Sequence, residues 1–168
     1  MNDITKQFIE HIPRLHRYAR VLLKNSADAD DLLQDCLERA CSRANTSPPT
    51  INLRAWLFTI MHNLFANRIR AKTQRPEMTE YNDEITMHES AAPENGLLVR
   101  DISGAMELLA VEQREVLLLV AVEDMRYEDI AELLNVPIGT VMSRLSRARK
   151  NLRSILENDK VVTLKRVQ

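Results

Sequence analysis

Apolar residues recur every three or four positions over most of the chain, the spacing that places them on one face of an α-helix. The stripe over residues 12–23 predicts a helix that ends near Asn25. A second stripe over residues 29–40 predicts a helix capped by Ser26, and the acids in its first turn suit the positive end of a helix. Two adjacent prolines then interrupt the pattern, which predicts a loop over residues 42–53.

A third helix is predicted to begin near Arg54 and to run to about Thr73. Its first part is apolar and its last part is polar and basic, so we expect one end to pack and the other to be exposed. The core candidates of the packed part are Trp56, Leu57, Ile60, Met61 and Leu64. Residues 76–96 follow with many acids and little apolar periodicity, which is typical of a flexible linker.

The second half of the chain resumes the helical spacing and is expected to have a core of its own. Residues 102–109 predict one helix, and residues 113–122 predict another that is apolar on nearly all sides. A short amphipathic segment over residues 127–134, a turn, and a longer stripe over residues 141–156 then form a helix-turn-helix pattern.

The turn of this pattern has residue types that suit it. Asn135 can take the left-handed conformation that ends a helix, and Pro137 suits the start of the next one. Gly139 is interpreted as a position that permits close helix packing or close approach to DNA.

These elements predict an all-α protein of two small helical domains, residues 1–75 and 97–168, joined by an acidic linker over residues 76–96. The length of 168 residues suits this division. Only three glycines occur, so neither the dinucleotide turn nor the phosphate loop of nucleotide-binding proteins can be built. The chain shows no signal-peptide core and no run of about 20 apolar residues, so we expect a cytoplasmic protein without membrane insertion.

Charge is strongly segregated along the chain, although the net charge is only -1. Residues 39–76 hold seven basic side chains and no acid, and residues 133–156 hold five basic side chains and no acid. An ordinary solvated helix face has no reason to exclude acids over such lengths. A surface that binds a polyanion does, because acids would repel the bound polyanion. Nucleic acid is therefore the leading candidate partner.

The last helix carries the more specific of these two basic surfaces. Its apolar residues face inward, which leaves an outer stripe with arginines and hydroxyls and no carboxylate. Such a stripe suits the major groove, where arginines reach guanine edges and hydroxyls reach phosphates or bases. An amphipathic helix with a solvated basic face is the plainer alternative. The stripe consists of Thr140, Ser143, Arg144, Arg147 and Lys150.

The other chemistry-bearing residues form no recognisable site. The four histidines lie in different segments without the spacing of metal ligands, so neither a metal nor another cofactor is expected. Cys36 and Cys41 are five positions apart in one helix, where their side chains diverge, so both are expected to be reduced. The scattered carboxylates are assigned to solvation and docking, and no nucleophile motif occurs. We therefore expect the chain not to be an enzyme.

Three segments resemble the extracytoplasmic-function group of bacterial RNA polymerase sigma factors, the minimal kind that holds only regions two and four. Residues 28–35, with the sequence DADDLLQD, resemble region 2.2. Residues 53–60, with the sequence LRAWLFTI and followed by Asn63, resemble regions 2.3 and 2.4. Residues 127–149 resemble region 4.2. The order of the three segments and the acidic linker between them make the resemblance more specific than a helix-turn-helix pattern alone.

The resemblance implies a function for the first half of the chain. Members of the family dock the region 2.2 helix on the clamp helices of the polymerase β′ subunit and also contact the β flap. This implies polymerase contacts at Asp31, Gln34 and Asp35. Members open the −10 element by capturing an unstacked base in the following loop, here about residues 45–52, and hold the strand with the next helix. The implied −10 contacts are Asn45, Asn63, Asn67, Arg68 and Arg70.

For the second half, the family uses region 4.2 to read the −35 element of the promoter. The resemblance therefore assigns base reading to the stripe between Thr140 and Lys150. It also implies an anti-sigma factor as a further partner. Where the family often has an acid, this chain has Asn67, which removes a repulsion from DNA phosphates.

Two other functions fit parts of the sequence. A sigma-like decoy would sequester an anti-sigma protein and never bind DNA, but the basic stripe on the last helix argues against it. A helix-turn-helix regulator would use its first half to sense or to dimerise, but the acidic helix followed by the basic helix that contains Trp56 argues against that.

Overall fold

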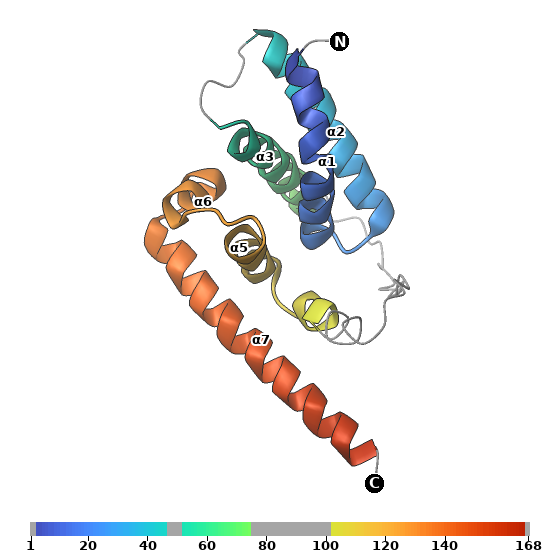
Figure 1. The fold of residues 1–168 in the computed structure, drawn as a ribbon, viewed down its shortest axis with the longest axis vertical. Coiled ribbons are helices and arrows are strands. Elements are labelled where there is room, and N and C mark those ends of the chain that lie inside the picture. Colours follow the sequence, from blue (N-terminus) through green and yellow to red (C-terminus); the bar gives the residue numbers. More distant parts are fainter. Residues whose placement is uncertain (1–2, 47–51, 75–101, 167–168) are drawn as a thin grey trace.

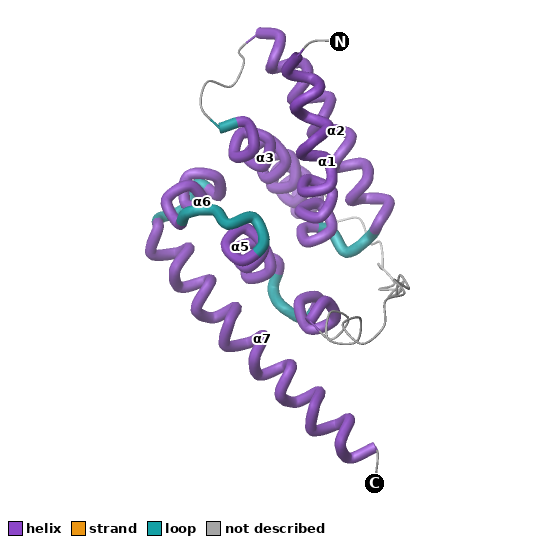
Figure 2. The backbone as a smooth tube through the Cα atoms, viewed as in Figure 1, coloured by secondary structure: helices purple, strands orange, loops and turns teal. Residues whose placement is uncertain are grey.

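A computed structural model of the chain describes residues 3–46, 52–74 and 102–166, and all regular secondary structure in these ranges is helical (Figures 1 and 2). The N-terminal unit consists of α1 (Asp3–Leu22), α2 (Ser26–Thr46) and α3 (Leu53–Gln74). The C-terminal unit consists of a short helix over residues 102–107, then α5 (Val111–Ala121), α6 (Tyr127–Leu134) and α7 (Ile138–Arg166). The all-α fold expected from the apolar spacing is therefore confirmed. The expected linker over residues 76–96 lies outside the described residues.

Asparagine side chains cap α2 and α3. The Asn25 side-chain oxygen accepts the backbone N–H of Asp28 at 3.2 Å, and the Asn52 oxygen accepts that of Ala55 at 3.2 Å. The prediction that Ser26 caps the second helix is therefore wrong, because the capping oxygen belongs to the preceding residue. The predicted loop also begins too early, since α2 continues to Thr46 and no helix-breaking residue occurs before the prolines.

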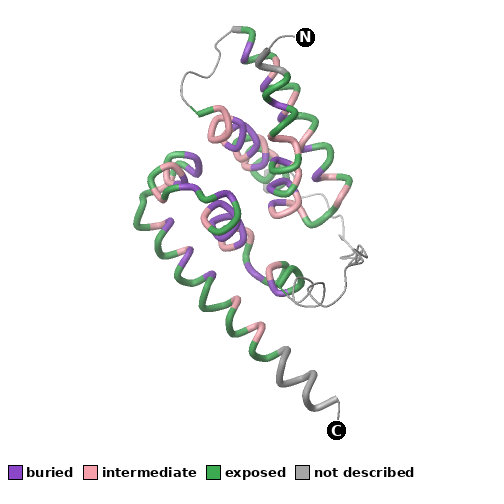
Figure 3. Tube along the Cα trace, viewed as in Figure 1, coloured by how far each residue is buried: buried purple, intermediate pink, exposed green. Residues whose placement is uncertain are grey.

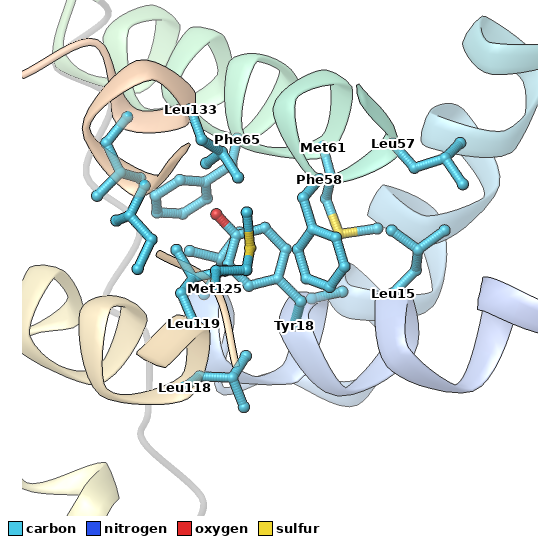
Figure 4. Packing of buried hydrophobic residues seen from close by; sticks show 14 of the residues in the cluster. Leu15, Tyr18, Leu57, Phe58, Met61, Phe65, Leu118, Leu119, Met125 and Leu133 are labelled. Atoms are coloured by element: carbon cyan, nitrogen blue, oxygen red, sulfur yellow. The ribbon is translucent and has the colours of Figure 1, made fainter. Parts of the chain in front are cut away.

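The core runs without interruption through both units. α1 packs on α2 and α3 within its own unit and on α5 of the other, and α3 also packs on α6. Figure 4 shows Tyr18 and Phe58 of the N-terminal unit in one apolar group with Leu119, Met125 and Leu133 of the C-terminal unit. The expectation of a separate core for the second half is therefore wrong. Residues 114–119 of α5 are all buried, and helices of both units are needed to cover them.

The helix-turn-helix turn has the predicted backbone conformation. Asn135 ends α6 with φ 52° and ψ 49°, the left-handed region, and its N–H bonds the carbonyl of Glu132. α7 then begins directly after Pro137, as predicted. A Cβ built on Gly139 would meet no atom within 4 Å, so the interpretation of this glycine as a close-packing position is wrong.

α7 packs along its first part and extends away from the other helices toward the C-terminus (Figure 1). Along this first part, buried and exposed residues alternate with the helical period (Figure 3). None of the described helices is both long enough and apolar enough to span a bilayer.

Candidate nucleic-acid surfaces and the contact between the two units

The acidic face of α2 is open to solvent. Asp31, Gln34 and Asp35 are all exposed and lie within one turn of each other on the helix. The Gln34 amide donates to Glu38 at 3.0 Å, and the Asp35 carboxylate lies 2.5 Å from the Arg68 guanidinium on α3. The three side chains assigned to polymerase docking by the resemblance therefore form one accessible surface.

The candidate −10 residues fall into two places. Asn63, Asn67 and Arg70 are exposed on the second half of α3. Arg68 is half-buried and bonds both the Asp35 carboxylate and, at 3.4 Å, the backbone carbonyl of Asp28. It therefore ties this part of α3 to the first half of α2.

Asn45 is exposed but does not join this group. It lies near the end of α2 that leads toward the start of α3, whereas Arg68 bonds residues from the first half of α2. The structure therefore separates Asn45 from the other candidate −10 residues. Most of the loop expected to hold the captured base, residues 47–51, lies outside the described residues.

The candidate −35 stripe lies on the outer side of α7. Ser143, Arg147 and Lys150 are exposed, and Thr140 and Arg144 are half-buried. The Ser143 hydroxyl donates to the Thr140 carbonyl at 3.0 Å, so its hydrogen is used within the helix. The two arginines and the lysine are the members of the stripe that carry positive charge toward solvent.

Two carboxylates that sequence analysis assigned to solvation are buried instead. Glu115 on α5 is 3% exposed and Glu123 in the loop after α5 is 1% exposed. A buried carboxylate requires charged or hydrogen-bonding partners to offset the loss of hydration. For both glutamates, the side-chain partners come from the N-terminal unit.

Glu115 is held by hydrogen bonds from two helices. The Tyr18 hydroxyl on α1 donates to it, and the His62 ring Nδ1 on α3 lies 2.7 Å from the same carboxylate oxygen. Burial raises the pKa of Tyr18 well above its ordinary value, and the negative charge of Glu115 raises it further. The Tyr18 hydroxyl therefore remains protonated and available as a donor.

Glu123 is held mainly by arginines. The guanidinium groups of Arg14 and Arg17 on α1 lie 3.5 and 3.3 Å from its two carboxylate oxygens. Arg54, at the start of α3, donates to the backbone carbonyl of the same residue at 2.8 Å. The next residue, Asp124, takes a positive φ of 49°, which turns the chain toward α6.

Neither glutamate left a signal in the sequence. Glu115 ends a polar run of four residues, 112–115, which is typical of the exposed start of a helix. The neighbours of Glu123, Asp124 and Arg126, are typical of an exposed turn.

The two cysteines form no disulfide with each other, and Cys36 and Cys41 are both free. The Cys36 thiol donates to the Leu57 carbonyl at 3.6 Å, and burial raises its pKa to about 12. Within the described part of the chain, no three His, Cys, Asp or Glu side chains group in a way that could hold a metal ion.

Comparison with known proteins gives matches in both units. Residues 8–62 match the family described as the Sigma2 domain of PhyR, and residues 100–152 match the family described as Sigma-70, region 4. The chain is 34% identical over 158 residues to the ECF RNA polymerase sigma factor EcfG of Rhodopseudomonas palustris (strain TIE-1), covering 94% of this chain and 87% of that one.

Two solved structures are similar in fold over most of their length. The sigma factor RpoE of Bartonella quintana, in complex with the anti-sigma factor NepR, has a TM-score of 0.75 and 31% identity, with 94% of this chain and 98% of that one covered. CnrH, in complex with the cytosolic domain of CnrY, has a TM-score of 0.65 and 25% identity, with 92% and 88% covered.

Proposed function

The chain belongs to the ECF sigma factors of bacterial RNA polymerase, and we propose that it docks on core polymerase with α2 and reads promoter DNA with α3 and α7. As a member of this family it serves as an alternative sigma factor that directs transcription. The assignment of each step to particular residues is the proposal, and it is argued below surface by surface.

Docking on core polymerase is assigned to the acidic face of α2. Asp31, Gln34 and Asp35 are exposed and share one turn, so a basic helical surface of the polymerase can reach all three together. We assign this contact to the β′ clamp helices, and a second contact of the C-terminal unit to the β flap.

Opening and reading of the −10 element are assigned to the second half of α3. Extruding a base costs a few kcal/mol, which phosphate contacts and a pocket must offset. Asn63, Asn67 and Arg70 offer amides and a positive charge on an exposed surface, and Arg68 lies beside them. Asn45 stands apart, so we assign it to the loop side of this interface.

Reading of the −35 element is assigned to the stripe on α7. Arg144 and Arg147 can reach guanine edges in the major groove, and Lys150 further along the helix is placed for a phosphate. Thr140 and Ser143 complete the stripe near the start of the helix. The absence of acids over residues 133–156 supports this assignment, because no carboxylate repels the DNA backbone.

An anti-sigma factor is the further partner that we assign to this chain. The similar structure of RpoE holds the anti-sigma factor NepR, and that of CnrH holds the cytosolic domain of CnrY. Since this chain covers nearly all of both sigma factors in the comparison, a partner of the same class would find a similar arrangement of helices.

The observation that carries the proposal is the placement of an exposed acidic face on one unit and an acid-free basic stripe on the other. Run-off transcription with core polymerase on a promoter library tests it directly. We expect transcripts that start at a common promoter sequence. A chain that binds polymerase without directing transcription would be a decoy, and one that binds DNA without polymerase would be a regulator.

Docking is tested by replacing Asp31, Gln34 and Asp35 together by alanine. We expect association with core polymerase to be abolished while helical content stays unchanged, because all three side chains are exposed. The matched control replaces two acids and one glutamine elsewhere on the surface, namely Gln7, Glu10 and Glu128. Undiminished association of the docking variant would refute the assignment to α2.

A further inference from the structure

The contact between the two units includes two buried carboxylates. The buried side chains of Glu115 and Glu123 belong to the C-terminal unit, while their side-chain partners Tyr18, His62, Arg14 and Arg17 belong to the N-terminal unit. Among the described residues, the side-chain partners of both carboxylates all come from the other unit. The burial of these two charges is therefore tied to the closing of one unit on the other.

This closed arrangement conflicts with the geometry of a promoter. α6, the first helix of the helix-turn-helix, packs on α3, which carries the candidate −10 residues. The −35 and −10 elements are about 25 base pairs apart, which at ~3.4 Å per pair is about 85 Å along the duplex. A compact chain of 168 residues has a radius of gyration of only about 15 Å. The closed chain cannot reach both elements at once.

We propose that Glu115 and Glu123 form a latch that holds the free chain closed and keeps it from reading both promoter elements until the two units separate. The inference rests on the proposed promoter reading for its inhibitory role, and on the contacts alone for the latch itself. The face of α1 that carries Arg14 and Arg17 is thus covered by the second half of the same chain.

The chemistry of the latch suits a contact that must reopen. Arg14 and Arg17 remain 47% and 50% exposed in the closed form, so opening changes their hydration little. Each carboxylate regains water when the units part, which offsets the loss of its partners. Loss of the partners while the units stay closed would leave each carboxylate buried and unpaired, which is strongly unfavourable. Removing the arginines therefore favours the open form, in which the carboxylates are hydrated.

Small-angle X-ray scattering of the full-length free protein tests the latch without polymerase or DNA. The first variant is Glu115→Gln with Glu123→Gln, which keeps the side-chain shapes and removes both charges. The second variant is Arg14→Glu with Arg17→Glu, which reverses charges on half-exposed positions and spares the core. The control is Lys24→Glu with Arg39→Glu, the same charge change at exposed positions on the N-terminal unit.

We expect both latch variants to have a radius of gyration about a fifth or more above that of the wild type, with helical content by circular dichroism unchanged, and the control to match the wild type. Equal radii in the latch variants and the wild type overturn the proposal. So does a wild-type chain that is already as extended as the variants.

Transcription with limiting core polymerase then tests the inhibitory role. We expect the arginine variant to reach half-maximal transcription at about a third of the wild-type concentration or less, because a smaller share of the chain is closed. An expanded variant with unchanged half-maximal concentration overturns the inhibitory role. A wild-type chain that directs no transcription overturns the proposed function instead, and the scattering result still decides the latch.

Discussion

α5 and α7 lie side by side in the C-terminal unit but have opposite surroundings. Residues 114–119 of α5 are all buried, including an arginine and a glutamate, because both units cover that helix. Among the described side chains of α7, the buried ones are Val141, Leu145 and Ala148, which form a single stripe. The buried Arg114 and Glu115 of α5 thus serve contacts inside the molecule, while Arg147 and Lys150 of α7 are exposed to solvent. Substitutions in the two helices should therefore affect different properties.

The largest expected effect is on stability and comes from α5. Leu119 is fully buried, so Leu119→Ala should lower the free energy of unfolding by about 2 to 5 kcal/mol, measured by urea denaturation. Met142 on α7 is 52% exposed, and Met142→Ala should change the free energy of unfolding by less than about 0.5 kcal/mol. Equal losses in the two variants would break the contrast between the helices.

The next effect is on promoter discrimination and comes from α7. Arg144→Ala in the holoenzyme should reduce discrimination at one −35 position by about 1 to 3 kcal/mol, because a bidentate contact to guanine is lost. Lys150→Ala should weaken binding to all sequences alike and reduce the salt slope by about one. Binding to a panel of −35 variants at two salt concentrations measures both. If Arg144→Ala weakens every sequence equally, Arg144 does not read a base.

A smaller effect is expected at the turn that sets the direction of α7. Asn135 has a left-handed backbone, in which alanine is strained, so Asn135→Ala should lower the free energy of unfolding by about 1 kcal/mol. Asn135→Gly at the same position should be near neutral, because glycine adopts this conformation without strain. Denaturation curves of the two variants separate backbone strain from loss of the side chain. A glycine variant as unstable as the alanine variant would assign the effect to the amide.

The smallest effect at neutral pH concerns Tyr18, which contacts α5 from the other unit. Its pKa is raised in the folded chain, so the protonated form stabilises the fold fully below about pH 10, the ordinary value, and this contribution is lost as the pH rises toward the raised pKa. Unfolding measured between neutral and strongly alkaline pH should therefore show a loss in the wild type that Tyr18→Phe reduces. Identical pH profiles would mean that Tyr18 does not titrate in this window.

Local sequence predicted the features that depend on one helix or one turn. The left-handed Asn135 and the start of α7 after Pro137 followed from the residue types at the turn. The exposure of Asp31, Gln34 and Asp35 followed from the apolar spacing of α2. In each case the structure that forms depends on residues within a few positions.

The contact between the units could not be predicted in the same way. Glu115 bonds Tyr18 across 97 positions and His62 across 53, and periodicity within a helix does not reveal what covers its face. Asn45 shows the same limit, since its distance from Arg68 follows from how α2 and α3 pack.

The continuous core also determines how the protein unfolds. Because α5 is covered by both units, neither unit can lose its structure without exposing apolar surface on the other, so the closed chain should melt cooperatively in a single transition. The two units then share one free energy of unfolding. A fragment that begins at α5 would expose the side of that helix that α1 covers, and it would be less stable than the same residues are in the whole chain.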